Sequence, residues 1–496
     1  MMRSLYSGVS GLKVHQTKMD VIGNNIANVN TVGFKGSSVT FSDVFYQTTQ
    51  SASGANEETG AAGQNAIQIG LGAGLSAITT NVSTAGGSQR TDNPFDCMIG
   101  GDGFFIVNSG GSDYFTKNGS FKVDAAGTLC TSGGANVMGW QVDKDGKIVK
   151  AQVSALKIMS QENLYAKPKA TTNAYVSGNI DKKDTQLDST GGYPAQVSFY
   201  DNVGNSYTAK LAVKRTNPVV DGQYTVTVTD IVTKGDANSG TNDQSIFATY
   251  DATGKLTGAS TITKFKFGEL EYSAVVNTTT GVIDLSTTTS GAPNILEFNA
   301  SNGTYSGIHK TGEGDADKKK AKTMLFDLSN TADPTNPFSA TGISIDFSSI
   351  TQYSTGDKSN LESTKGDFAG TGAGLPVGNM TGVSIDTSGK IYGTYDNGTN
   401  KLLGQIAVAT FANPAGLEAV GDTLFAQTKN SGEFDGIGQD PSSNGGSLTT
   451  GVLEMSNVDL STEFTNMITT QRGFQANSRI ITTSDTLLEE LVNLKR

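Results

Sequence analysis

The sequence is short of the residue types on which most binding and catalytic chemistry depends. Among 496 residues it has two histidines, two cysteines and one tryptophan, and 17% of its residues are charged. His15 and His309 stand far apart in unlike contexts, which argues against a histidine metal site or a catalytic triad. Cys97 and Cys130 lack a CxxC spacing; two free thiols or one bridge both fit. We expect no catalytic residue, metal or cofactor.

Long apolar runs and an excess of positive charge are also missing. No stretch is long and apolar enough to predict a membrane span, and the first residues lack the continuous apolar region of a cleavable secretory signal. The formal net charge is −11, whereas nucleic-acid binding requires a dense basic face. Taken alone, these features predict a cytoplasmic protein that binds no nucleic acid and does not insert into a membrane.

What the sequence has in abundance is glycine and small polar residues. It contains 61 glycines but only 10 prolines. Such a composition indicates β-rich domains with many tight turns, and disorder is the rival interpretation. The 22 phenylalanines and 15 tyrosines recur throughout the chain, which favours folded domains.

The first thirty residues carry apolar side chains at helical spacing. Steps of three and four residues connect the members of this N-terminal stripe and predict an amphipathic helix with a coiled-coil-like seam. Gly8, Gly11 and Gly23 weaken that helix by about 1 kcal/mol each relative to alanine. It therefore needs a partner. The predicted assembly residues of this stripe are Leu5, Val9, Leu12, Met19, Ile22 and Ile26.

The last forty residues repeat the same pattern, with Ser456 and Asn457 as start signals just before them. A second apolar stripe runs beside the first, and a single intramolecular partner would cover only one of them. This favours contacts with neighbouring subunits, while packing of both helices on a globular domain is the alternative. The predicted assembly residues are Phe464, Met467, Phe474, Ile481 and Leu488 on the first stripe and Leu491 on the second.

Between the ends, strand and turn signals dominate. Residues 101–129, 193–215, 222–230 and 402–417 read as strands and hairpins. Composition shifts predict a nested organisation: a terminal helical layer (1–30 and 455–496), a connecting segment (31–72 and 445–454), an inner β-domain (73–165 and 372–444) and an inserted outer β-domain (166–371). The insert is one domain or two, divided near 236–244. The fold class is mainly β with terminal α-helices.

One short motif resembles a metal loop. The stretch "DKDGK" (143–147) matches the beginning of a calcium loop, but the remaining ligands and the closing glutamate are absent. A hairpin turn explains it better. A carbohydrate-binding or carbohydrate-cleaving β-protein remains a general alternative for a chain of this composition.

Three segments together resemble the bacterial flagellar axial proteins, the family of rod, hook and hook-associated proteins. They are "SLYSGVSGLKVHQTKMDVIGNNIANVNTVGFKGSSVTF" (4–41), "GGDGFFIV" (100–107) and "GVLEMSNVDLSTEFTNMITTQRGFQANSRIITTSDTLLEELVNL" (451–494). The large insertion fits the hook type. Distal rod proteins are usually shorter, and hook–filament junction proteins usually carry more terminal helix.

The resemblance implies a structural subunit without catalytic activity. It implies a homopolymeric, flexible hook tube that transmits motor torque, with the terminal helices around a central export channel. The implied partners are further copies of the chain, the rod and hook–filament junction proteins, the hook cap and the flagellar export apparatus. The location becomes the extracellular flagellum, reached without a cleaved signal.

Two groups of residues acquire roles through this resemblance. The asparagine- and glycine-rich end of the first helix is expected to be a soft hinge, because Asn and Gly tolerate turn conformations; its members are Asn24, Asn25, Asn28, Asn30, Gly33 and Gly36. An ordinary helix end followed by a loop is the simpler interpretation. Phe41 and Phe45 resemble an aromatic export element, and two core aromatics would explain them equally well.

Overall fold

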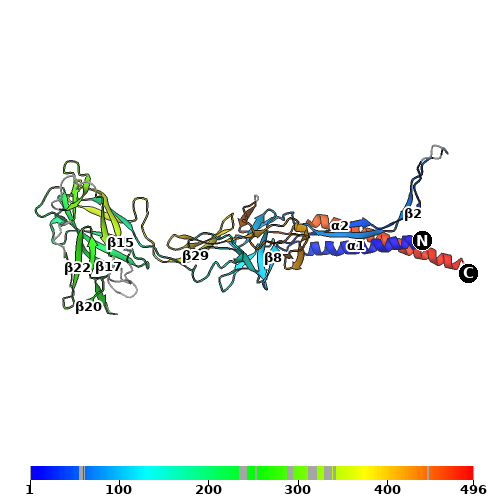
Figure 1. Cartoon of the computed structure of the whole chain (residues 1–496), viewed down its shortest axis with the longest axis horizontal. Helices are drawn as coiled ribbons and strands as arrows, with labels where there is room; N and C mark the ends of the chain where they lie inside the picture. The colour runs from blue at the N-terminus through cyan, green and yellow to red at the C-terminus, as the bar shows by residue number, and fades with distance from the viewer. Residues whose placement is uncertain are drawn as a thin grey trace. The chain divides into compact units, whose positions relative to one another are not determined.

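The computed structural model describes residues 2–54, 60, 62–233, 243–251, 254–280, 282–287, 294–310, 321–328, 338, 342–443 and 446–494. The chain divides into two compact units. The terminal unit contains Met1–Leu164, Met380–Thr394 and Asn400–Arg496, and the inserted unit contains Tyr165–Asn379 and Tyr395–Thr399. In Figure 1 the terminal unit carries both ends of the colour scale. The four-part organisation expected from composition has boundaries that differ from those of these two units, and it stays a prediction.

Two long α-helices, α1 (Met2–Ala27) and α2 (Leu460–Asn493), lie side by side near the two chain ends. The start signals expected at Ser456 and Asn457 are wrong: Asp459 caps α2, and its carboxylate accepts hydrogen bonds from the Ser461 N–H (2.9 Å) and the Thr462 hydroxyl (2.7 Å). No helix in the described part of the chain is long and apolar enough to cross a membrane. The predicted class, mainly β with terminal helices, is confirmed.

The terminal unit is built on an antiparallel sheet in the order β29-β30-β31-β11-β7-β8-β34-β33. Its strands are β1 (Ser37–Asp43), β2 (Tyr46–Gln50), β3 (Ile67–Gly70), β4 (Ala73–Thr80), β5 (Ser88–Arg90), β6 (Cys97–Gly100), β7 (Phe104–Ser109), β8 (Ser112–Thr116), β9 (Phe121–Val123), β10 (Leu129–Thr131), β11 (Asn136–Gln141), β12 (Ser154–Ala155), β29 (Gly378–Ile385, whose first two residues lie in the inserted unit), β30 (Lys390–Tyr395), β31 (Asn400–Ile406), β32 (Val408–Ala409), β33 (Glu418–Gly421), β34 (Leu424–Ala426), β35 (Ser447–Thr450) and β36 (Val452–Glu454).

Strand β7 explains the apolar run in "GGDGFFIV". Successive side chains of a strand point to opposite faces of the sheet. Phe105 and Val107 accordingly enter one hydrophobic core, and Phe104 and Ile106 enter another; all four are fully buried. The strands predicted in 101–129 and 402–417 are confirmed as β7–β10 and as β31 and β32.

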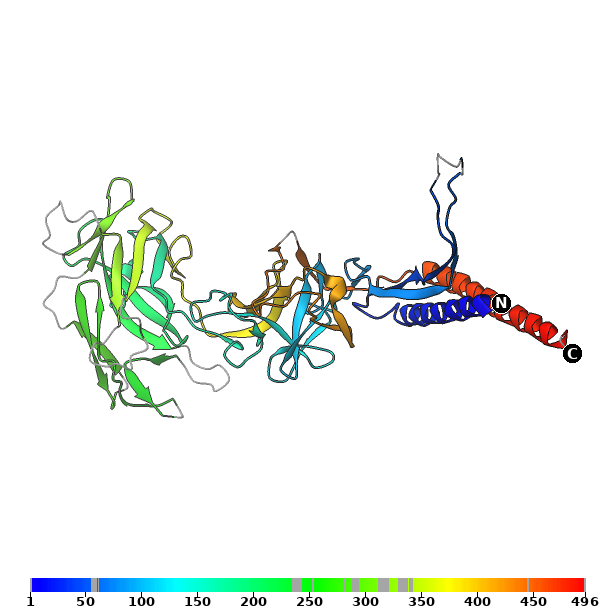
Figure 2. The same ribbon diagram turned by 45° about the vertical axis from the view of Figure 1, so that its right-hand side comes forward.

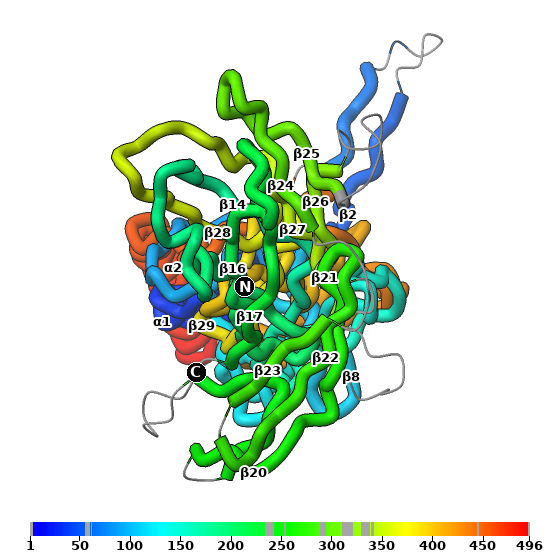
Figure 3. The backbone as a smooth tube through the Cα atoms, turned by 90° about the vertical axis from the view of Figure 1, so that its left-hand side faces the viewer, coloured from blue at the N-terminus to red at the C-terminus, as the bar shows by residue number. Residues whose placement is uncertain are grey.

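The inserted unit is a sandwich of two sheets, ordered β23-β22-β21-β26-β27-β14-β28 and β15-β16-β17-β24-β25. Figure 3 shows β21, β22 and β23 as neighbours. The strands are β13 (Tyr165–Ala166), β14 (Asn173–Asn179), β15 (Tyr193–Tyr200), β16 (Ser206–Arg215), β17 (Gln223–Thr233), β18 (Gln244–Ser245), β19 (Ala248–Tyr250), β20 (Leu256–Ala259), β21 (Lys264–Phe267), β22 (Leu270–Asn277), β23 (Val282–Thr287), β24 (Asn294–Phe298), β25 (Tyr305–Lys310), β26 (Thr323–Asp327), β27 (Ile343–Thr351) and β28 (Asn360–Lys365).

Both sheets of the inserted unit contribute to one hydrophobic core. Phe199 of β15 and Leu296 of β24 belong to the same buried cluster as Phe267 of β21 and Phe347 of β27. The hairpin predicted over 193–215 and the strand predicted over 222–230 are confirmed. The segment proposed as a division, 236–244, lies outside the described residues except for its last two.

Many of the glycines serve one repeated turn, Asp-x-x-Gly-x. In each turn the aspartate Oδ1 accepts a hydrogen bond from the N–H four residues later, and the glycine has a positive φ. A residue with a Cβ rarely adopts that φ, which explains the glycine. The "DKDGK" stretch is one of these hairpin turns, as predicted. The turns are 124–128, 143–147, 201–205, 251–255, 367–371 and 386–390.

Candidate assembly interface

The two terminal helices form an antiparallel pair. Ser4 lies against Ser484, with 3.5 Å between their Oγ atoms, and Asn25 at the other end of α1 donates a hydrogen bond to Glu463 Oε1 at 3.3 Å. The two ends of a 496-residue chain are therefore brought together in one register. The sequence predicted the two helices but not the residues through which they meet.

Glycines allow the helices to approach closely. A Cβ atom on Gly11 would lie 2.6 Å from Asn477 Nδ2, and one on Gly473 would lie 2.8 Å from the His15 ring. At Gly8 the nearest atom would be Ile481 Cγ1 at 3.2 Å. The glycines that reduce the helix propensity of α1 are thus the residues that permit this packing. From the sequence alone, only the loss of helix propensity at these glycines is apparent.

The contact line lies beside the predicted apolar stripe of α1. Gly8 and Gly11 face α2, while Val9 and Leu12 follow them by one position, a rotation of about 100° around a helix. Ile22 is buried, whereas Val9 is exposed; the other stripe residues, Leu5, Leu12, Met19 and Ile26, are half-buried.

The stripe of α2 is covered only in part. Its buried positions are Thr470 and Ser484, which are polar. Phe464 and Leu491 are exposed, and the other predicted assembly residues, Met467, Phe474, Ile481 and Leu488, are half-buried. The fully buried positions of α2 in the described helix pair are thus small and polar, whereas α1 also buries Val14 and Ile22, and exposed apolar residues flank the contact line. The assembly role of these residues stays a prediction.

Asn25, one of the predicted hinge residues, connects three elements. Its Nδ2 donates to Ser37 O at 2.8 Å, and its Oδ1 accepts from Ser37 N at 3.0 Å, so the amide pairs with the start of β1 as a neighbouring strand would. The same Nδ2 lies against Glu463 of α2. The side chain is 2% exposed. This asparagine fixes how the chain leaves α1.

The other predicted hinge residues are also closely packed or bonded, with one exception. Gly33 has φ +70°, and a Cβ there would lie 2.7 Å from the Asn118 N atom. Gly36 N–H donates to Asn457 Oδ1 at 2.8 Å. Asn28 donates to Asn24 O at 3.0 Å at the end of α1, whereas Asn30 is exposed. A hinge role stays a prediction.

A buried ion pair that sequence reasoning missed lies next to these residues. Lys35 Nζ is 2.7 Å from Glu454 Oε1, and both side chains are 1% exposed. Lys35 also donates to Thr84 O at 2.7 Å, and the Gly86 N–H donates to Glu454 Oε1 at 3.0 Å. The partners are 419 residues apart in the chain, so no local pattern could reveal them. We call residues 33–37, 84–86, 117–118 and 454–458 the joint.

The predicted export aromatics have unlike surroundings. Phe41 on β1 packs edge-on against His15, with ring centroids 6.0 Å apart, and Lys18 Nζ lies 5.9 Å from its centroid. Phe45 is 82% exposed at the base of the β2–β3 ribbon. Phe41 is 38% exposed, so neither residue is a core aromatic, and the export role of both stays a prediction.

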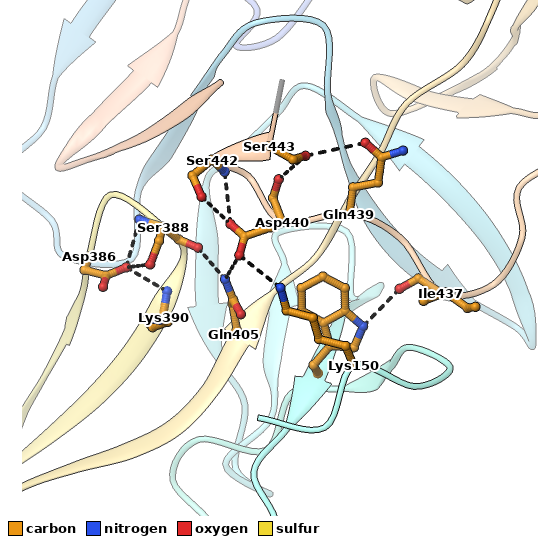
Figure 4. Close-up of polar contacts among 11 residues, drawn as sticks. Lys150, Asp386, Ser388, Lys390, Gln405, Ile437, Gln439, Asp440, Ser442 and Ser443 are labelled. Atoms are coloured by element: carbon orange, nitrogen blue, oxygen red, sulfur yellow. Dashed lines mark hydrogen bonds and ion pairs between the residues drawn. The ribbon is translucent and has the colours of Figure 1, made fainter. Parts of the chain in front are cut away.

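A polar cluster around Asp440 in the terminal unit is structural in character. Asp440 accepts hydrogen bonds from Gln405 Nε2 at 2.9 Å and from Ser442, and Lys150 Nζ lies 3.4 Å from its Oδ2 (Figure 4). Burial opposes ionisation of Asp440, but these hydrogen bonds outweigh it and hold its pKa below the usual value. A carboxylate kept ionised in this way connects loops and is poorly suited to donate a proton.

The cysteines and acidic residues likewise show no reactive arrangement in the part of the chain that the structure describes. Cys97 and Cys130 are both free, and burial raises the pKa of the Cys97 thiol to about 12. Among the described residues no group of three His, Cys, Asp or Glu side chains is placed to hold a metal ion.

Segments of this chain match models of known protein families. Three family models match: "Flagella basal body rod protein" over residues 5–35, "Flagellar hook protein FlgE/F/G D1 domain" over 98–173, and "Flagellar basal body rod FlgEFG protein C-terminal" over 449–494. The first covers α1 from Leu5 onward, and the third contains α2. The second contains β7 and β11 of the central sheet.

Full-length relatives agree with these matches. The flagellar hook protein FlgE of Treponema pallidum is 34% identical over the whole of both chains, and that of Borreliella burgdorferi is 35% identical over the same extent. FlgE of Salmonella typhimurium is 31% identical over 99% of this chain and all of its own. The crystal structure of Helicobacter pylori FlgE2 matches 73% of this chain and 98% of its own chain at 13% identity, with a TM-score of 0.31. On these full-length identities, the chain belongs to the flagellar hook protein family.

Proposed function

We propose that this chain, as a structural subunit of the flagellar hook, polymerises through its terminal helix pair into a flexible tube that transmits motor torque and has no catalytic activity. The main support for this proposal is the apolar surface that α1 and α2 leave exposed beside the line along which they meet. Val9 and Phe464 are exposed large apolar residues on these helices. Large apolar residues left exposed along both helices of a folded chain indicate a partner. Further copies of the same chain are the partner we propose.

The end of α2 supports this proposal independently. Because Ser4 faces Ser484 and α1 begins at Met2, about the last seven residues of α2, and Leu494 after them, extend past the start of α1. This overhang carries four exposed apolar residues, of which Val492 is 67% exposed; the others are Leu487, Leu491 and Leu494. We propose that the α1–α2 pairs of neighbouring subunits cover it.

The β2–β3 ribbon is a second element without cover of its own. It leaves the helix pair as two antiparallel strands, as Figures 1 and 2 show, and every residue of both strands is exposed. An isolated two-stranded ribbon is marginal in water. Phe45, Tyr46, Ile67 and Ile69 are exposed apolar residues on or beside it. We propose that it packs on a neighbouring subunit in the tube.

The remaining partners follow from the family. We propose that the chain is exported through the flagellar export apparatus without a cleaved signal, with Phe41 and Phe45 as an export element. It then joins the rod at one end and the junction proteins at the other, under the hook cap. The distal rod and junction alternatives fit less well, because full-length relatives are hook proteins. The same relatives leave the carbohydrate-active alternative without support.

The experiment that tests this function has two parts. A strain lacking the gene should make basal bodies that end at the rod, as seen by electron microscopy, and the gene supplied in trans should restore curved hooks and motility. Purified chain should also form tubes at high concentration. Normal hooks in the deletion strain would overturn the proposal.

A further inference from the structure

A second buried lysine lies beside the Lys35–Glu454 ion pair. Lys117 is 4% exposed. Its Nζ donates to Gly101 O at 2.7 Å and lies 5.1 Å from the centroid of the Phe104 ring. It comes from the end of β8, whereas Lys35 follows the turn after α1 and Glu454 ends β36. Three segments thus place two buried lysines around one buried carboxylate.

Glu454 has room for a second partner. Its Oε1 receives both Lys35 Nζ and the Gly86 N–H. Its Oε2 is buried and accepts no hydrogen bond from any residue that the structure describes. A buried carboxylate oxygen without a donor is costly. Lys117 has the charge to satisfy it but is held instead by a neutral carbonyl.

The charges around Lys117 act in both directions. Burial disfavours its ammonium and lowers its pKa to about 8; Glu454 and Asp102 favour the charged form, and Lys35 opposes it. Within the described part of the chain, these three are the charged groups that shift the pKa of Lys117. Glu454 therefore attracts both lysines, and in this arrangement Lys35 is bonded to it while Lys117 is bonded to Gly101 O.

We propose that Glu454 is a shared acceptor that exchanges its lysine partner when the joint moves. In the arrangement described here Lys35 forms the ion pair with Glu454. When the 33–37 segment shifts away, Lys117 takes its place, so the buried carboxylate keeps a counter-charge in both arrangements. That the joint moves in the tube rests on the proposed function, whereas the exchange itself is a property of the single chain.

The test is a double-mutant cycle on the full-length monomer at pH 7, followed by denaturant unfolding of the terminal unit. Lys117→Met alone should stabilise, since it removes a buried charge that lacks a carboxylate partner. In the Lys35→Met background the same change should destabilise, because Glu454 then loses its remaining counter-charge. Lys150→Met, a change at a half-exposed lysine of the same unit, is the control and should act equally in both backgrounds.

The pH profile gives a second, independent measure. The folded pKa of Lys117 is about 8 against an ordinary 10.5, so the unfolded chain binds more protons between these values and stability rises with pH across that window. The difference between the wild type and Lys117→Met should change by up to ~300-fold in the folding equilibrium. In Lys35→Met this rise should shrink, because Lys117 is then held in its charged form.

Either of two results would overturn the exchange. One is an equal effect of Lys117→Met in both backgrounds. The other, which needs only the wild type, is an NMR titration in which Lys117 loses its proton near pH 10.5. Both readouts concern the monomer, so they can fail while tube formation succeeds, and the reverse also holds.

Discussion

Gly11 of α1 lies against Asn477 of α2 so closely that a Cβ atom on the glycine would be 2.6 Å from the asparagine Nδ2. In a helix interior glycine costs about 1 kcal/mol relative to alanine. Here the loss of propensity is offset by a close contact in which the Asn477 amide packs over Gly11, so a larger residue would have to displace that side chain. The same trade recurs at Gly473, which faces His15.

We predict that Gly11→Leu separates the helix pair and weakens polymerisation. Overpacking a closely fitted contact costs about 1–3 kcal/mol, which corresponds to a ~10–100-fold higher concentration for tube formation. Light scattering and electron microscopy of purified chain measure this. Gly23→Ala is the matched control, since among the described residues no other part of the fold lies within 4 Å of the position that a Cβ would take there. It should stabilise α1 by about 1 kcal/mol and leave polymerisation intact. Equal behaviour of the two variants would refute the close-contact argument.

The face of the helices that meets its partner could not be read from the sequence. Apolar periodicity marks Val9 and Leu12, so the helix–helix seam was predicted to pass through them. The observed contact passes one position earlier, at Gly8 and Gly11. Apolar periodicity could not reveal it, because glycine has no hydrophobic side chain. Strands such as β7 were predictable because a run of four apolar residues has one simple structural explanation.

The joint was harder still to predict. Asn25 was singled out for conformational tolerance, and the structure shows it as a hydrogen-bonding centre between α1, β1 and α2. Lys35 and Glu454 gave no signal at all, because their pairing depends on the tertiary fold of both chain ends. Long-range polar contacts of this kind follow from topology, which a single sequence does not display.

Asn25→Asp should destabilise the monomer. The substitution replaces an amide that donates to Ser37 O and Glu463 with a carboxylate that repels both. Leaving these buried groups unsatisfied costs about 1–3 kcal/mol, measured by denaturant unfolding. Asn30→Asp, at an exposed position of the same turn, should change stability by less than about 0.5 kcal/mol. A similar loss from both would mean that only the added charge matters.

The overhang of α2 offers a cleaner separation of folding from assembly. Leu491→Asp should leave the free energy of unfolding of the monomer unchanged, because the side chain is exposed and α1 does not extend alongside it. In the tube the same carboxylate would be buried among apolar neighbours, so polymerisation and motility should be lost. Glu489→Ala on the same turn is the control and should polymerise normally. A destabilised Leu491→Asp monomer would place the overhang in the fold of the single chain instead.

The cysteines report on the terminal unit. Cys97 is fully buried, and its thiol pKa of about 12 keeps it protonated, whereas Cys130 is partly accessible. Alkylation at pH 8 should therefore modify Cys130 first and Cys97 only on unfolding, as read by mass spectrometry. Above pH 9 the unfolded thiol loses its proton while the folded one keeps it. Stability should then fall as pH rises toward 12, and Cys97→Ala should remove that loss.

The main segment of the inserted unit, Tyr165–Asn379, begins and ends at a single strand pair. In β13 and β29, Tyr165 pairs with Asn379 and Ala166 pairs with Gly378, in antiparallel register. A two-residue Asn-Gly turn can join such a pair as a type I′ hairpin. Replacing residues 167–377 by Asn-Gly should therefore close the chain without strain.

The shortened chain should fold, because the two cores of the terminal unit use no residue that is removed. Export and tube formation should persist, since α1, α2 and the β2–β3 ribbon are kept. The curvature and bending stiffness of the tube should change, as measured by electron microscopy, because any contact between inserted units is gone. A longer Gly/Ser linker in place of the turn is the control for strain at the junction. If both shortened chains fold but neither polymerises, the inserted unit contributes contacts that the tube requires, and assembly cannot rest on the helix pair and ribbon alone.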